Sequence, residues 1–215
     1  MTSIAIIDYG MGNLHSIAKA LEHVAGKERV LVSSQPAKIL AADRVVFPGV
    51  GAIRDCMAEL KRSGLGDVVI QAAASKPLLG VCLGMQALLD ISDENQGTSC
   101  LGIIPGKVVH FPDDMHEDVS GNRLKIPHMG WNQVRQQGEH AMWSDIETDS
   151  RFYFVHSYYT IPAREKDIAA VTPYGIDFTS VLARENIFAV QFHPEKSQHV
   201  GLQLLSNFVR WNGDT

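Results

Sequence analysis

The strongest constraint on the fold is a repeated order of short apolar runs, glycine-containing turns and amphipathic segments in the first half of the chain. Residues 3–7 form an apolar run that is closed by a turn at 8–13, and apolar residues then recur at helical spacing up to Val24. The same order returns in the segments 29–32, 36–41, 44–47, 48–51 and 52–75. Strands that alternate with helices in this way form parallel β-α-β units.

The second half of the chain has a different texture. Leu83–Ile91 is expected to be helical, and after it the apolar runs follow one another without intervening helices until a closing helix at 200–211. These runs lie at 103–109, around Val134, and at 152–159, 168–171, 178–183 and 187–192. We therefore expect an α/β fold: an open mixed, mostly parallel sheet flanked by helices, with a second, smaller antiparallel part in the C-terminal half. No repeat or Pro/Ser-rich linker interrupts the sequence, so residues 1–215 are expected to form a single domain.

Composition excludes several classes of function. The net charge is −5 and no block of Lys or Arg is present, which argues against a nucleic-acid partner. No apolar stretch approaches the roughly 18 residues of a membrane helix, and the N-terminus lacks the pattern of a signal peptide, so a cytoplasmic location is expected. The three cysteines have no metal-ligand spacing and are expected to be free thiols. We expect no metal and no cofactor.

One of these cysteines occupies a special place. Cys82 lies between an apolar run at 76–81 and the helical pattern that begins at Leu83, so it stands at a strand-to-helix corner. Sites in open α/β sheets gather at the carboxyl ends of strands. Gly80 and Gly84 are expected to let the backbone turn sharply, and the amino end of the following helix would favour a thiolate. The pattern is that of a nucleophile elbow carrying cysteine.

A nucleophile of this kind needs a base and an oxyanion hole. His193 follows an apolar strand, and Glu195 stands two residues later, where a carboxylate can orient an imidazole. Cys82, His193 and Glu195 are therefore predicted to form a catalytic triad. Backbone N–H groups of Val50, in a glycine-containing turn, and of Leu83 are the predicted oxyanion donors. The predicted chemistry is acyl transfer through a thioester.

Two motifs together resemble a known family. Residues 80–86 (GVCLGMQ) and 193–195 (HPE), in that order, are similar to those of the triad-type (class I) glutamine amidotransferases, and the resemblance runs from Ile4 to Trp211. It implies an α/β fold and hydrolysis of glutamine to glutamate and ammonia. Further turns resemble one branch of the family, the glutaminase subunits of imidazole glycerol phosphate synthases in histidine biosynthesis. These turns are at 8–14 (DYGMGNL), 48–52 (PGVGA), 127–132 (PHMGWN), 154–158 (FVHSY) and 193–197 (HPEKS).

The resemblance to that branch implies further roles. It implies a heterodimer with a cyclase subunit that receives ammonia through an internal channel and makes imidazole glycerol phosphate and the aminoimidazole carboxamide ribotide. The residues implied to hold glutamine are Gly51, Gln86, Ser157 and Tyr158. The residues implied to lie at or near the interface with the cyclase are Asn13, Trp131, Tyr153 and Lys196.

Other interpretations stay open at this point. A stand-alone cysteine hydrolase of γ-glutamyl or peptide substrates would have the same triad but would need no partner. A binding module on the same fold would have a Cys82 that does not react with a glutamine-like electrophile. Cys56 and Cys100 are expected to be inert, and His128 and His156 are expected to be structural.

Overall fold

The parallel half of the fold occupies the N-terminal part of the chain. The computed structural model describes residues 2–116 and 121–214. Its first strands are β1 (Ser3–Ile7), β2 (Arg29–Ser33), β3 (Arg44–Gly49) and β4 (Leu78–Cys82). They alternate with the helices α1 (Leu14–Val24), α2 (Pro36–Ala41), α3 (Ile53–Ser63) and α4 (Leu65–Ala73). Strands β1 to β4 pair in parallel, as expected for β-α-β units.

The rest of the chain adds mainly antiparallel pairs to the same sheet. Its helical elements are α5 (Leu83–Gln86), the 3-10 turns η1 (Glu94–Gln96), η2 (Ala141–Trp143), η3 (Glu165–Asp167) and η4 (Pro194–Lys196), and α6 (Gln198–Arg210). Its strands are β5 (Ile91–Ser92), β6 (Thr98–Ser99), β7 (Gly106–His110), β8 (His128–Gln136), β9 (Ser150–His156), β10 (Tyr158–Pro162), β11 (Ile168–Pro173), β12 (Asp177–Arg184) and β13 (Ile187–Val190).

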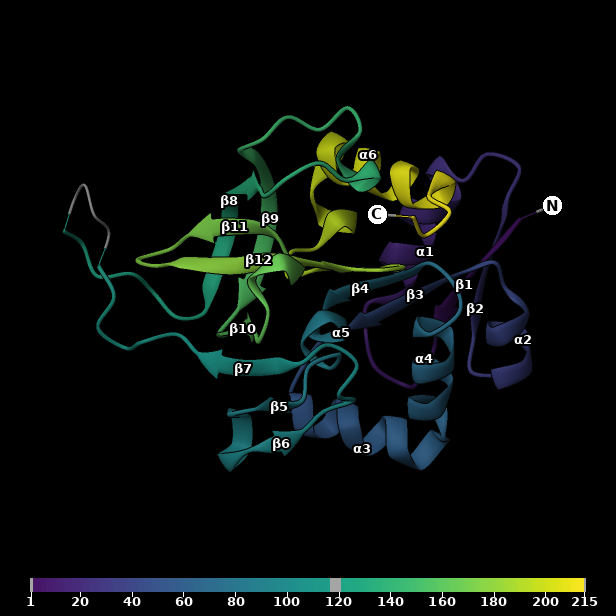
Figure 1. Cartoon of the computed structure of the whole chain (residues 1–215), viewed down its shortest axis with the longest axis horizontal. Helices are drawn as coiled ribbons and strands as arrows, with labels where there is room; N and C mark the ends of the chain where they lie inside the picture. Colours follow the sequence, from purple (N-terminus) through teal and green to yellow (C-terminus); the bar gives the residue numbers. More distant parts are fainter. Residues whose placement is uncertain (1, 117–120, 215) are drawn as a thin grey trace.

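The strand order places the last strand in the middle of the sheet. Within the described residues the order is β2-β1-β3-β4-β13-β12-β10-β7-β5-β6, with β11, β8 and β9 branching from β12. Strand β13 pairs in parallel with β4 and antiparallel with β12, so it joins the two halves. Figure 1 shows the branch β8-β9-β11 at one end of the molecule and the parallel strands at the other.

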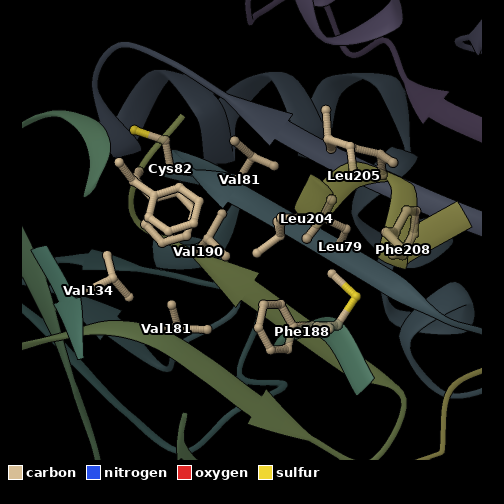
Figure 2. Packing of buried hydrophobic residues seen from close by; sticks show 14 of the residues in the cluster. Leu79, Val81, Cys82, Val134, Val181, Phe188, Val190, Leu204, Leu205 and Phe208 are labelled. Atoms are coloured by element: carbon tan, nitrogen blue, oxygen red, sulfur yellow. The ribbon is translucent and has the colours of Figure 1, made fainter. Parts of the chain in front are cut away.

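Helices cover both faces of the parallel strands. In Figure 1, α1 and α6 lie on one side of the sheet, and α3 and α4 lie on the other. Each face has its own buried apolar cluster. The first cluster contains Val81, Val190, Leu204 and Phe208, and the second contains Phe47, Leu60 and Val69. Figure 2 shows Leu79, Val81 and Cys82 in a row along β4, with Val190 of the neighbouring strand beside them.

The expected fold class is confirmed, and three elements differ from expectation. The helical stretch to about residue 75 divides into α3 and α4 at Gly64, which has a φ of 71°. The strand expected at 152–159 divides into β9 and β10 at Ser157. The helix expected over Leu83–Ile91 ends at Gln86. After that residue, backbone N–H groups of the segment 101–104 bind the carbonyls of residues 87–89, so these carbonyls no longer serve helical bonds.

Candidate active site

The sharp turn at the candidate nucleophile is made by the cysteine itself. Cys82 is the last residue of β4, and it has a φ of 54° and a ψ of −111°. A side-chain-bearing residue in this region is strained by about 1–3 kcal/mol, so the surrounding structure must hold it there. The expectation that Gly80 and Gly84 make the turn is wrong, because neither has a positive φ.

The two flanking glycines serve close packing instead. A Cβ atom on Gly84 would overlap the backbone carbonyl oxygen of Phe47 in β3. A Cβ atom on Gly80 would lie 3.0 Å from the Cβ atom of Ala189 in β13. The glycines therefore allow β3 and β13 to approach the corner on both sides. This approach holds Cys82 in its strained conformation.

The candidate base reaches the nucleophile from the adjacent strand. Strand β13 runs parallel to β4 with Val190 opposite Val81, and His193 follows three residues after Val190. The Nδ1 atom of His193 lies 2.9 Å from Oε1 of Glu195, and both side chains are only 3% exposed. An imidazole that donates Nδ1–H to a carboxylate has Nε2 free for the thiol. Within the described residues, Nε2 is buried and has no hydrogen-bond partner of regular geometry.

The electrostatics favour a charged base. Burial lowers the pKa of His193, but hydrogen bonding and charge from Cys82 and Glu195 outweigh it, so the net pKa is raised above the ordinary value. An imidazolium beside the sulfur stabilises a thiolate. The helix that was expected to help is only the four residues of α5, so its dipole contributes little. The positive charge next to the sulfur therefore comes mainly from His193.

The other cysteines and histidines lack this environment. Burial raises the pKa of Cys56 to about 11 and that of Cys100 to about 12, so both are protonated near neutral pH. His128 and His156 form a buried pair with 2.9 Å between Nδ1 and Nε2. Burial lowers their pKa values to about 4 and about 3. Both imidazoles are neutral, in agreement with the expected structural role.

Most of the predicted site residues line one cavity beside Cys82. The cavity has a volume of about 410 Å³, within the usual range for a small-molecule site. Its lining includes the predicted nucleophile and base, both predicted oxyanion residues and all four residues implied to hold glutamine: Cys82, His193, Val50, Leu83, Gly51, Gln86, Ser157 and Tyr158. Glu195 lies behind His193 and is not part of the lining.

Sequence reasoning missed an acidic residue of this cavity. Glu94 also lines it, and its carboxylate accepts a hydrogen bond of 3.0 Å from the backbone N–H of Ile53. In the sequence, Glu94 stands in a polar loop and resembles any solvent-facing acid. Only the folding of that loop over α3 brings the carboxylate to the cavity. Lys196, implied to lie near the interface, lines the same cavity.

Three of the four residues implied at the interface form one group. Trp131 lies opposite Tyr153 in the pair β8-β9, and their ring centroids are 6.1 Å apart. The Nζ atom of Lys196 lies 5.9 Å from the centroid of the Tyr153 ring. The Trp131 side chain is exposed, as expected of an interface anchor. Asn13 is placed separately, at the start of α1, where its side chain accepts a bond from the Ser16 N–H.

The described part of the chain offers neither a metal cluster nor a membrane-spanning helix. Residues 2–116 and 121–214 contain no group of three or more His, Cys, Asp or Glu side chains able to hold a metal ion. In the same residues, no helix has the length and apolar character needed to cross a membrane.

Comparison with known proteins decides the family. The model of the family "Glutamine amidotransferase class-I" matches residues 5–211. The chain belongs to the class-I glutamine amidotransferases. Members with closely similar sequences include "Imidazole glycerol phosphate synthase subunit HisH" of Nitrosococcus oceani, which is 61% identical over 99% of both chains. Subunit HisH 1 of Pseudomonas aeruginosa is 58% identical, again over 99% of both chains.

Solved structures with low sequence identity share the fold. The chain resembles a structure of PurLQS from Thermotoga maritima with a TM-score of 0.72 and 14% identity, over 97% of this chain and 98% of the other. It also resembles a crystal structure of a glutamine amidotransferase from Thermotoga maritima with a TM-score of 0.58 and 14% identity, over 90% of this chain and 76% of the other. At these identities the likeness concerns the class-I amidotransferase fold alone.

Proposed function

We propose that this class-I glutamine amidotransferase is the glutaminase subunit of an imidazole glycerol phosphate synthase. It hydrolyses L-glutamine to glutamate and ammonia and passes the ammonia to a cyclase subunit. The cyclase makes imidazole glycerol phosphate and the aminoimidazole carboxamide ribotide in histidine biosynthesis. The observation that carries the proposal is the strained Cys82 beside the buried His193–Glu195 pair, in a chain that is 61% identical over nearly its whole length to a subunit of that name.

The first half of the reaction makes a thioester. The Cys82 sulfur attacks the carbon of the glutamine carboxamide, and the electron pair of the C=O bond moves to oxygen. His193, protonated by the thiol, then gives that proton to the amide nitrogen. The C–N bond breaks and ammonia leaves, while the acyl group stays on sulfur. Glu195 keeps the imidazole in the tautomer and orientation that this transfer needs.

The second half restores the enzyme. His193 takes a proton from water as the water oxygen attacks the thioester carbon. The C–S bond then breaks, the sulfur recovers its proton, and glutamate is released. Backbone N–H groups of Val50 and Leu83 are the proposed donors to the oxyanion in both halves. The lining of the cavity by both residues supports this assignment.

Charge in the cavity suits an amino-acid substrate. We assign glutamine binding to Gly51, Gln86, Ser157 and Tyr158, which all line the cavity. Glu94 supplies a carboxylate there, and we infer that it attracts the α-ammonium group of glutamine. We assign Ser157 and Tyr158, which line the cavity, to the other polar ends of the substrate.

The partner is proposed to dock next to the cavity. An exposed Trp131 packed edge-on against Tyr153, with Lys196 over that ring, supports an interface there, because aromatic and cationic anchors dominate interface energetics. We assign Asn13 to the periphery of the same interface. Lys196 belongs to both the proposed interface and the cavity, so docking of the cyclase and events in the cavity are proposed to be coupled.

Two further assignments complete the proposal. One sheet runs through the described residues from β2 to β6, which supports residues 1–215 as one amidotransferase domain. The three free thiols suit the reducing cytoplasm, where we place the activity.

The test is a stepwise glutaminase assay. Glutamate release is measured for the chain alone, with a cyclase subunit, and with the cyclase and its nucleotide substrate, with Cys82→Ala as the blank. We expect the rate to rise at each addition, because the turn at Val50 is proposed to take its active form only when partner and ligand are bound. Equal rates in all three mixtures would refute the subunit assignment. Activity that persists in Cys82→Ala would refute the triad.

A further inference from the structure

One buried amide lies directly behind the reactive sulfur and is not part of the triad or of the cavity lining. Gln191 follows the last residue of β13, in an otherwise apolar run from Ile187 to Phe192. Its side chain is fully buried. Burying an amide costs about 1–3 kcal/mol unless its polar atoms are paired, so its presence among apolar neighbours calls for specific partners.

Both ends of the Gln191 amide reach residues of the site. Its Nε2 atom donates toward Sγ of Cys82 at 3.7 Å. Its Oε1 atom accepts a hydrogen bond of 2.9 Å from Nε2 of Gln86. The strand register explains the contact with sulfur, because Val190 is opposite Val81 and the next residues, Gln191 and Cys82, are therefore neighbours.

The contact with Gln86 fixes which end of that side chain the cavity receives. The Nε2 group of Gln86 has two N–H bonds, and both are used: one to Gln191 and one, at 3.1 Å, to the carbonyl oxygen of Tyr158. If the Gln86 amide were flipped, its oxygen would face two acceptor oxygens, those of Gln191 and Tyr158, and neither hydrogen bond could form. Gln86 lines the cavity, so the atom left to contact a ligand is its Oε1 acceptor. An acceptor there selects a ligand with an N–H donor, which glutamine has at both ends.

We propose that Gln191 is a catalytic residue with two tasks: its N–H stabilises the Cys82 thiolate, and its carbonyl positions the Gln86 amide so that Oε1 faces the substrate. This inference rests on the proposed glutaminase function and deepens it. The two tasks use opposite ends of one amide. Single substitutions can therefore separate them.

Two variants divide the tasks. Gln191→Glu retains an acceptor for Gln86 and loses the N–H donor to sulfur, while Gln191→Met has similar length and loses both. Gln71→Glu, on the exposed face of α4, makes the same chemical change away from the site and is the matched control. The folded state of each variant is compared by thermal unfolding.

The first measurement is the rate of Cys82 alkylation by iodoacetamide from pH 5 to 10, followed by mass of the Cys82 peptide. It needs neither turnover nor partner. The titratable groups that face the sulfur are His193 with Glu195, Tyr9 from the turn after β1, and Glu94 and Lys196 on the cavity. Gln191→Glu adds its own carboxyl to this set. Gln191→Met adds no titratable group, so its midpoint is the one that tests the N–H donor. We expect the alkylation midpoint to rise by about one pH unit in both Gln191 variants and not in Gln71→Glu.

The second measurement is protection of Cys82 by glutamine. We expect the glutamine concentration for half-protection to rise about tenfold in Gln191→Met and to stay near the wild-type value in Gln191→Glu. A merely structural Gln191 would change the unfolding temperature and leave both the alkylation midpoint and the protection unchanged. That result would overturn the proposal.

Two further outcomes are distinguishable. If glutamine fails to protect the wild-type chain both alone and with the cyclase subunit and its nucleotide substrate, the proposed glutaminase function fails rather than the role of Gln191. If neither Gln191 variant folds, the side-chain ¹⁵N amide signal of Gln191 is followed in the wild-type chain. We then expect its chemical shift to change with pH with the same midpoint as Cys82 alkylation. A chemical shift that does not change at that midpoint would overturn the contact with sulfur.

Discussion

The packing of Gly84 against β3 leads to a quantitative prediction. In Gly84→Ala, the added Cβ would overlap the carbonyl oxygen of Phe47 and lie 3.0 Å from the carbonyl carbon. Both are backbone atoms of a buried strand, so neither can rotate away. Overpacking a core costs about 1–3 kcal/mol, and a backbone obstacle places this case at about 3 kcal/mol. Replacing a helical glycine by alanine stabilises the folded state by about 1 kcal/mol, so the net loss of unfolding free energy is about 2 kcal/mol.

Gly66→Ala is the matched control, because it is also a helical glycine. An added Cβ there meets only Cδ2 of Leu101 at 3.7 Å and atoms of Leu60 at 3.9 Å, and the residue has no positive φ. We expect this variant to gain about 0.5–1 kcal/mol. The two variants should therefore differ by about 3 kcal/mol in the free energy of unfolding.

Urea unfolding of both variants measures that difference, provided that the m-value stays constant. Alkylation of Cys82 serves as the functional measurement, since a displaced α5 moves the corner that holds the sulfur. We expect slower alkylation in Gly84→Ala and an unchanged rate in Gly66→Ala. Unfolding free energies within about 0.5 kcal/mol of each other would show that β3 shifts at little cost to accommodate the added methyl group. The packing explanation of the two glycines would then be wrong.

Three further predictions concern other parts of the chain. At pH 7, Cys82 should be alkylated at least tenfold faster than Cys56 and Cys100, whose raised pKa values keep them protonated, and peptide mass spectrometry that finds equal rates would contradict this. His128 binds a proton with a pKa of about 4 when folded and about 6.5 when unfolded, so its contribution to stability is present above pH 6.5 and is lost as the pH falls towards 4. His128→Gln should therefore reduce the loss of unfolding free energy between pH 7 and pH 5 by about 2 kcal/mol, whereas an unchanged pH dependence would mean that folding does not lower the pKa of His128. Trp131→Ala should weaken cyclase binding about tenfold or more in titration calorimetry and leave Cys82 alkylation in the isolated chain unchanged, and equal affinity would remove Trp131 from the proposed interface.

The sequence was a good guide to whatever depends on local pattern. The apolar runs give the strands, and the position of Cys82 after such a run predicts its place at the end of β4. The prediction that His193 lies near Cys82 also follows from local pattern, since Cys82 ends one buried strand and His193 follows shortly after another. The pairing of β13 with β4 then brings those ends together.

What the sequence could not give depends on contacts between distant segments. The early end of α5 follows from hydrogen bonds made by residues 101–104. The apolar spacing after Leu83 contains no sign of these distant partners. Cys82 has a positive φ, which residues with a side chain rarely adopt, so the residue type does not predict this conformation. Gln191 resembles one polar residue within an apolar run, and Glu94 resembles a loop acid. Their roles emerge only from what lies beside them in space.

The position of β13 has a consequence for the synthesis of the chain. Cys82 leaves the ribosome more than 100 residues before His193 and Glu195. Until then, the edge of β4 that β13 will occupy has no strand beside it, so the nascent chain has an incomplete sheet between β4 and β12. Such an edge is open to pairing with other chains. A thiol of enhanced reactivity is thus assembled only when the last strand closes the sheet, and the growing polypeptide carries an ordinary cysteine until that moment.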